Sequence, residues 1–275
     1  MTDLLDRARS NPSAARRVAL AKVRARMRTW LLTRARRVWP PVGMVRLGNL
    51  RRLNPIGASF GFFRGTPIDR YYIERFLSRH AGEPDYILGD IRGRVLEVGA
   101  ARYARKFGRW TGEPPPDPAP AAVAELDILH VDRSNPAATI IGDLTDADHI
   151  PSDSYDCVIC TQTLLLIYDV RAAIRTLHRI LKPGGVLLAT EPGISKLCRP
   201  DYDLWGDYWR FTSLSMRRLF EEAFPAEGLT VESYGNVLAA VAFLHGLAAE
   251  DLKQHELDLH DPDFEVTIAI RAVKG

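Results

Sequence analysis

The sequence predicts a doubly wound α/β fold, in which a mostly parallel sheet is covered by helices on both faces. Two observations lead to this prediction. From residue 93 onward, short apolar runs alternate with stretches of helical periodicity, the pattern of a parallel sheet. The first run ends in Glu97 and Gly99 and passes directly into a helical stretch. Such a strand–glycine–helix turn is where an α/β sheet can open a nucleoside-binding crevice.

We expect seven strands, at 94–99, 127–132, 138–142, 155–161, 184–190, 229–235 and 264–272. Helices are expected at 67–80, 101–109, 169–181, 212–224 and 236–254. The order strand, helix, terminal strand at the end of the chain suggests that the last strand is inserted antiparallel. Residues 113–120 are rich in proline and predict a surface excursion between the first core helix and the second strand.

Length and composition fit one large domain with an appendage. The chain has 275 residues, 46% of them hydrophobic, which is enough to bury a substantial core. We expect a basic helical extension and lid at 1–66 and the main domain at 67–275. Three cysteines make a disulfide framework improbable, and the chain shows no apolar run of membrane-spanning or secretory type. These features favour a cytoplasmic protein.

The first 52 residues are strongly basic, with fourteen Lys/Arg against two acids. Apolar residues recur at helical spacing from Leu20 to Val38, which predicts a basic amphipathic helix. This helix can pack on the body or on a partner subunit in a homo-oligomer, or it can lie on an anionic membrane surface. Nucleic acid is disfavoured as a partner because no nucleic-acid motif accompanies the arginines.

Two residues carry the first chemical prediction. Gly99 lets the backbone approach a ligand where a Cβ would intrude. About thirty residues later the second strand ends in Asp132, whose carboxylate can accept both hydroxyls of a ribose.

Residues 68–273 resemble the class I S-adenosylmethionine-dependent methyltransferases in four segments that follow the family's order. These are Glu97–Tyr103, Asp132, Gly142–Leu144 and the turn Leu181–Gly185 with the strand after it. The resemblance implies a Rossmann-like sheet of seven strands with the last one antiparallel, and S-adenosylmethionine bound across the carboxyl ends of the first strands. The chain departs from the family where further glycines are usual, because alanines stand at positions 100 and 101.

The resemblance also implies residues for the cofactor. Glu97, Gly99, Ala100 and Ala101 would lie near its methionine part, Asp132 at the ribose, and Asp143 and Leu144 at the adenine. Thr161 and Gln162 would lie beside the reactive methyl group, and Tyr72 and Arg75 would close over the carboxylate.

The segment after the fifth strand commonly forms a wall of the acceptor pocket in this family. Here it contains Trp205, Asp207, Tyr208, Trp209 and Arg210, in which aromatic rings can stack on an acceptor while a charge orients it. We expect a small-molecule acceptor: a sugar, a lipid-linked compound or a natural product. Asp207, Glu191 and His245 are the candidates for a general base.

Oxygen is favoured over nitrogen as the atom that receives the methyl group. The fourth strand is followed by Thr161-Gln-Thr163, not by the Asn/Asp-Pro-Pro-Tyr of methyltransferases that act on amide or adenine nitrogens. Cys157 and Cys160 have zinc spacing but fall inside a predicted buried strand, so we expect no metal. The alternative function is a non-catalytic protein of this fold, tethered to a membrane or a partner through its basic helix.

Overall fold

The computed structural model describes residues 43–81, 89–110 and 122–275, together with Leu20, Val23, Arg24, Met27 and Pro40. Leu20, Val23, Arg24 and Met27 are helical. The rest of the predicted basic helix lies outside the described residues, as does the proline-rich stretch 113–120.

The chain divides into two compact units, Met1–Arg52 and Leu53–Gly275. The boundary between these two units lies at 52/53. Residues 53–66 belong with the body because they bind to it: the Gly57 amide donates to the carbonyl of His245, and Arg64 pairs with Asp251.

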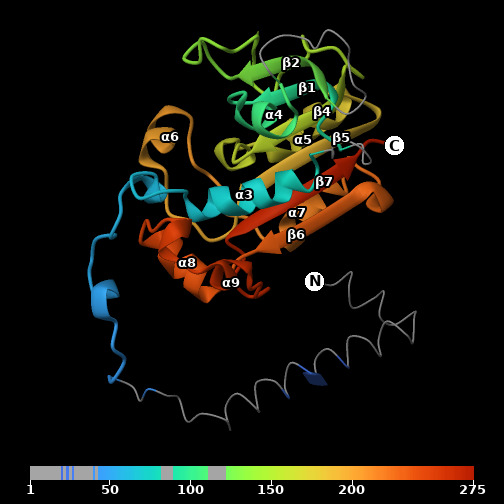
Figure 1. The fold of residues 1–275 in the computed structure, drawn as a ribbon. Coiled ribbons are helices and arrows are strands. Elements are labelled where there is room, and N and C mark those ends of the chain that lie inside the picture. Colours follow the sequence, from blue (N-terminus) through green and yellow to red (C-terminus); the bar gives the residue numbers. More distant parts are fainter. Residues whose placement is uncertain are drawn as a thin grey trace. The chain divides into compact units, whose positions relative to one another are not determined.

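Seven strands form one sheet in the order β3-β2-β1-β4-β5-β7-β6 (Figure 1). Strands β1 to β5 pair in parallel, and β7 runs antiparallel to both of its neighbours, as expected. Their bounds are β1 Gly93–Val98, β2 Val123–His130, β3 Ile140–Ile141, β4 Tyr155–Thr161, β5 Leu181–Pro192, β6 Leu229–Tyr234 and β7 Thr267–Val273. The strand order reverses between β1 and β4, and their connections diverge there. A crevice for ligands is expected at the carboxyl ends beside such a reversal.

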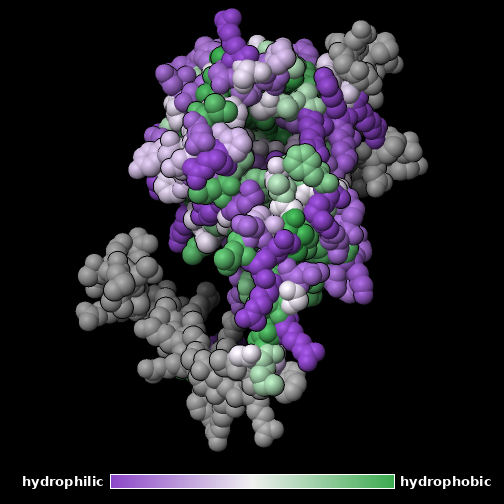
Figure 2. All heavy atoms as spheres, turned by 90° about the vertical axis from the view of Figure 1, so that its left-hand side faces the viewer, coloured by the Kyte–Doolittle hydropathy of each residue, from purple (hydrophilic) through white to green (hydrophobic). Residues whose placement is uncertain are grey.

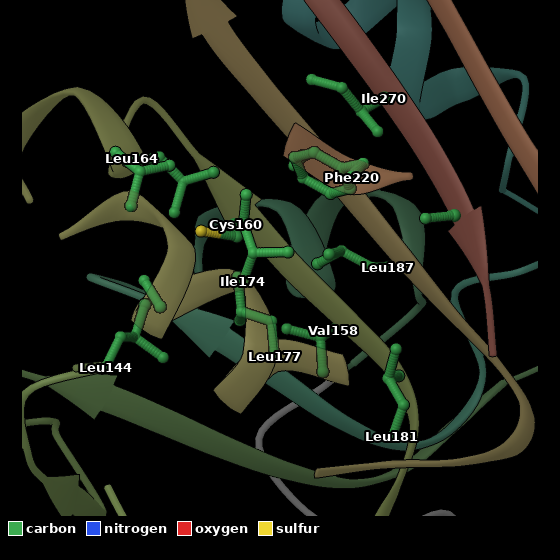
Figure 3. Close-up of a cluster of buried hydrophobic side chains, with 14 of the residues drawn as sticks. Leu144, Val158, Cys160, Leu164, Ile174, Leu177, Leu181, Leu187, Phe220 and Ile270 are labelled. Carbon is green, nitrogen blue, oxygen red and sulfur yellow. The ribbon is translucent and has the colours of Figure 1, made fainter. Parts of the chain in front are cut away.

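Helices cover both faces of the sheet. The α-helices are α3 Ile68–Ser78, α4 Arg102–Phe107, α5 Val170–Ile180, α6 Arg199–Leu204, α7 Ser213–Phe220, α8 Val237–Leu244 and α9 Gln254–Asp258. Helices α5 and α7 pack on one face through a buried cluster that includes Ile174, Leu187 and Phe220 (Figure 3). Helices α3 and α4 pack on the opposite face around Phe76 and Tyr103.

Polar side chains fix where several helices begin. Asp169 accepts the Ala172 amide at the start of α5, and Asn236 accepts the Ala239 amide at the start of α8. Thr212 and Ser215 form a reciprocal capping box at the start of α7. These caps hold the helices in register with the strands before them.

Several predicted boundaries differ from the structure. Strand β2 begins four residues earlier than expected, so Asp132 lies two residues past its end. Strand β5 begins at Leu181 and includes the predicted Lys-Pro-Gly-Gly turn. The helix expected at 236–254 ends at Leu244 because Gly246 adopts a φ of +66°, after which the chain forms a 3₁₀ turn and α9.

The two cysteines of β4 are buried, as expected for a strand of the core. Cys160 joins the cluster under α5, whereas Cys157 joins the cluster under α3 and α4. Residues three positions apart in a strand point to opposite faces, so these two thiols cannot bind one metal ion. Within the described part of the chain, no helix is both long and apolar enough to span a membrane.

The buried cluster under α5 and α7 predicts a large difference between two leucines. Leu187 is fully buried in β5, so Leu187→Ala should lower the free energy of unfolding by about 2–5 kcal/mol. Leu214 on α7 is 67% exposed, so Leu214→Ala should change it by less than about 0.5 kcal/mol. Urea denaturation followed by circular dichroism measures both. Equal losses would contradict the assignment of this core.

Candidate functional site

The turn after β1 is held by the buried carboxylate of Glu97. Only 2% of Glu97 is exposed, and its oxygens accept the backbone amides of Tyr103 at 2.9 Å and Ala104 at 2.8 Å. These amides belong to the first turn of α4, where helical N–H groups lack partners within the helix. Burial raises the pKa of Glu97 to about 7, against the opposing effect of these hydrogen bonds. Glu97 therefore fixes the position of α4 relative to β1.

Gly99 leaves open space beside the strand end. Its φ is +93°, in the left-handed region, and a Cβ built on it would meet no atom within 4 Å. Ala101 has a φ of −82°, and Ala100 is not among the described residues with positive φ. Only Gly99 requires left-handed backbone in this turn. The two alanines that depart from the family pattern therefore cause no backbone strain.

Asp132 lies next to this turn, as the resemblance implies. Its side chain is 48% exposed, with Oδ1 accepting the Ser134 amide at 2.8 Å and Oδ2 accepting the Trp205 indole N–H at 3.3 Å. Hydrogen bonds from Ser134 first, and then from Trp205, lower the pKa of Asp132 to about 2. Asn135 of the same loop donates to the Gly99 carbonyl at 2.7 Å and so joins the two segments. An ionised carboxylate thus borders the open space at Gly99.

Asp143 and Leu144 follow β3 but have different environments. Asp143 is exposed and accepts the Thr145 amide. Leu144 is 3% exposed and points into the core under α5 (Figure 3). The Leu144 side chain is part of the core, and this corrects its expected role at the adenine.

Thr161 and Gln162 end β4 at the same edge of the sheet. Gln162 adopts a φ of +51°, which is uncommon for a residue with a side chain, and its amide donates to the Thr190 carbonyl at 2.6 Å. Its side-chain Nε2 is buried without a hydrogen-bond partner. Strained backbone with an unsatisfied donor is often found at a ligand-binding position.

Glu191, one of the three base candidates, is fully buried at the end of β5. Its carboxylate accepts the amides of Leu164 at 2.9 Å and Leu165 at 3.0 Å, in the turn after β4. Burial raises its pKa to about 8. This corrects its predicted role, because a carboxylate enclosed in this way holds the turn and does not reach an acceptor.

Four further buried polar atoms lack hydrogen-bond partners near this edge. They are Arg70 Nε, Tyr103 Oη, Thr190 Oγ1 and Thr267 Oγ1. Thr190 pairs in register with Thr161, and Thr267 pairs with Pro192, so both hydroxyls lie at the carboxyl ends of β4 and β5. Arg70 and Tyr103 come from the first turns of α3 and α4 and interact with each other, and Arg70 Nε also lies 3.9 Å from the Asp69 carboxylate. Buried polar groups are nearly always satisfied, so this set indicates a polar ligand.

Sequence reasoning missed Arg70 and Tyr103 and chose Tyr72 and Arg75 from the same helix instead. The Tyr72 hydroxyl donates to the carbonyl of Leu257, and Arg75 pairs with Asp258. Both partners lie on α9, so these two side chains point away from Glu97 and Gly99. This corrects their predicted role. The sequence signals helix α3 but not which of its faces meets the strand ends.

Asp207 and Arg210 hold the segment after β5 together. Asp207 is 8% exposed and accepts the Cys198 amide at 3.0 Å as well as N–H groups of Arg210. Burial opposes ionisation, but the bond from Arg210 lowers the pKa of Asp207. Arg210 also donates to the carbonyls of Ser195 and Lys196. This corrects both predictions: Asp207 is no free base, and Arg210 is no free cation for an acceptor.

The aromatic residues of this segment separate into two groups. Trp205 contacts the edge of His130, at 5.8 Å between ring centroids, and lies beside Asp132. Tyr208 and Trp209 pack instead around Tyr168, a residue that the sequence analysis missed, at 5.5 and 5.9 Å. This corrects the position of Trp205, which belongs to the side of the ribose acid.

His245, the third base candidate, ends α8. Its carbonyl accepts the Gly57 amide, and its ring Nδ1 is buried without a hydrogen-bond partner. Among the residues that the structure describes, no group of three or more His, Cys, Asp or Glu side chains is placed to hold a metal ion.

Comparisons with known proteins agree with this geometry. Residues 115–189 match a family model described as a methyltransferase domain. The chain is 26% identical over 134 residues to the ubiquinone/menaquinone biosynthesis C-methyltransferase UbiE of Haemophilus ducreyi, a match that covers 45% of this chain and 48% of that protein. The same enzyme of Pectobacterium atrosepticum is 28% identical over 42% of this chain and 36% of its own length. The match thus spans about half of these relatives or less.

Among solved structures, a SAM-dependent methyltransferase from Archaeoglobus fulgidus is 11% identical, with a TM-score of 0.45 over 74% of this chain and 92% of that one. The family match, together with a seven-stranded sheet whose last strand is antiparallel, defines a methyltransferase domain. The matched region and the motifs of the chain are similar to those of S-adenosylmethionine-dependent methyltransferases of class I.

The buried carboxyl of Glu191 predicts a pH dependence of stability. Its pKa is about 8 in the folded protein, against an ordinary value of 4.5, so between these values the folded state keeps a proton that the unfolded chain has lost. Stability should therefore fall as pH rises from about 4.5 to 8 and level off above that. Glu191→Gln, which cannot ionise, should flatten the decline, most clearly above pH 7, where Glu97 adds little.

Urea denaturation at a series of pH values gives the slope of stability against pH, and this slope is the readout. Exposed Glu227→Gln is the matched control and should keep the wild-type slope. An unchanged slope in Glu191→Gln would show that this carboxyl is ionised throughout.

Proposed function

We propose that this protein binds S-adenosylmethionine across the carboxyl ends of β1, β2 and β4 and transfers its methyl group to a small-molecule acceptor. The observation that carries the proposal is the set of buried polar atoms without partners at the edge that also holds the Glu97–Gly99 turn and Asp132. A ligand with hydroxyl, amino and carboxylate groups would satisfy them.

The residues present fit the cofactor. Asp132 is ionised and has free acceptor capacity for ribose hydroxyls, and the open space at Gly99 admits a ligand close to the backbone. Arg70 and Tyr103 supply donors for a carboxylate, which is the role that the sequence analysis gave to Tyr72 and Arg75. Gln162 adds a donor at the end of β4.

The cofactor, when bound, supplies a methyl group already activated on a sulfonium. What remains for the protein is to position the reactants and to exclude water, and well-oriented groups can provide a large part of the rate enhancement. Glu97 and Glu191 fix the turns after β1 and β4, so the donors of these turns are preorganised. Asp207 and Glu191 are enclosed, so an acceptor with an acidic hydroxyl or an acidic carbon fits the site best.

We favour oxygen as the acceptor atom, because Thr161-Gln-Thr163 takes the place of the amide-type motif after β4. Tyr208, Trp209 and Tyr168 offer exposed rings for stacking on an acceptor near that turn. Carbon is the second candidate, and the support for it is that the relatives reported above are named as C-methyltransferases.

Calorimetry with S-adenosylhomocysteine tests the proposal. The wild-type protein should bind it, and Asp132→Ala should weaken binding by about ten- to a hundredfold, because ribose hydroxyls lose a charged acceptor. Exposed Asp146→Ala, in the turn after β3, is the matched control and should bind like the wild type. Failure of the wild-type protein to bind millimolar ligand would reject the enzyme and leave the non-catalytic alternative.

A further inference from the structure

Helix α6 is joined to the proposed cofactor site through Trp205. The residue directly follows α6, and its indole N–H donates to Asp132 Oδ2 at 3.3 Å while its ring lies against His130. No residue of α6 is buried, and Tyr202 and Leu204 are exposed. Figure 2 looks toward the side of the molecule that carries α6, where apolar and hydrophilic residues are interspersed. Little apolar burial therefore holds α6 in place, and Trp205 connects its end to Asp132 and His130.

The two ends of the α6 segment are tied to each other. Asp207 accepts the Cys198 amide at 3.0 Å and so closes residues 198–207 into a loop. Arg210 pairs with Asp207 and donates to the carbonyl of Lys196 at 2.7 Å. The base of the loop is therefore fixed, while its tip at Trp205 depends on the contact with Asp132.

Gly206 lies between the tip and the base. Its φ is +97°, and a Cβ there would approach the Tyr208 ring to 2.4 Å. The backbone next to Trp205 thus has a conformation that favours glycine, and it leads directly to Asp207 and Tyr208. Gly206 thus joins the tip of the loop at Trp205 to its fixed base at Asp207.

We propose that residues 198–206 form a lid over the ribose end of the cofactor site and that Trp205 latches this lid to Asp132. The inference rests on the proposed function, which places ribose at Asp132. A carboxylate has about four lone-pair sites, and Asp132 already accepts the Ser134 amide and the Trp205 indole N–H, which leaves room for two ribose hydroxyls. The indole ring then covers the ribose, and the bound ligand contacts both partners of the latch.

A ligand that contacts both partners of the latch stabilises the lid, and the lid in turn slows the release of the ligand. Trp205 is thus a positioning residue, because it acts on the cofactor through Asp132.

Amide hydrogen exchange on the full-length wild-type protein tests the lid directly, with S-adenosylhomocysteine as the probe. Saturating ligand should slow exchange in residues 199–206 by about tenfold or more, beyond any change in α5 or α7. Binding without this protection would overturn the lid. Absence of binding would instead reject the proposed function, so the two failures are distinguishable.

Trp205→Phe keeps an aromatic ring and removes the indole N–H. We expect its dissociation constant for S-adenosylhomocysteine to rise about three- to tenfold, and the protection of residues 199–206 to be lost even at saturation. Tyr202→Phe, on helix α6, removes the hydroxyl of an exposed side chain and should behave like the wild type. Tighter binding by Trp205→Phe would show that the indole competes with the ribose, and unchanged protection would show that no latch exists; either result overturns the proposal.

Discussion

The turns at the carboxyl ends of β1 and β4 are held in place by two buried glutamates that bind backbone amides. Glu97 at the end of β1 accepts amides from the first turn of α4, and Glu191 at the end of β5 accepts amides from the turn after β4. Each carboxylate satisfies donors that a short helical turn leaves without partners. The two turns they hold flank the position where the strand order reverses. Glu97 and Glu191 thus support the two turns that border the site, and burial raises the pKa of both.

This construction explains how the chain departs from the family's glycine pattern without distorting the turn. A glycine is needed where φ is positive or where another group approaches the backbone. Gly99 meets the first condition, and the positions of Ala100 and Ala101 do not. Glu97 already holds the start of α4 from inside, so the turn does not depend on further glycines. The backbone conformation therefore shows better than the number of glycines which positions of this turn need a glycine.

The sequence was sufficient for the sheet and for the residues that sit on strand ends. Apolar runs placed the seven strands and put Asp132 at the end of the second one, whereas Gln162 was implied by the family resemblance. The start of β2 was harder to place. Asp127 lies inside this strand and accepts hydrogen bonds from Tyr155 and Thr139, partners that only the tertiary structure supplies. The same reason hid Arg70, because periodicity identifies α3 but not which of its arginines meets α4.

The fate of the charged residues after β5 bears on how catalysis would work. Asp207 and Arg210 form hydrogen bonds with each other and with the backbone of residues 195–198, so both charges stabilise the loop. Glu191 likewise binds the backbone amides of the turn after β4. A site whose acids are used in this way has to rely on orientation, and the rigid connection of both turns to the sheet provides it. The exception is Asp132, whose half-exposed carboxylate keeps acceptor capacity while Trp205 already contacts it. This carboxylate is positioned to respond to a ligand, and it links the cofactor side of the sheet to Trp205.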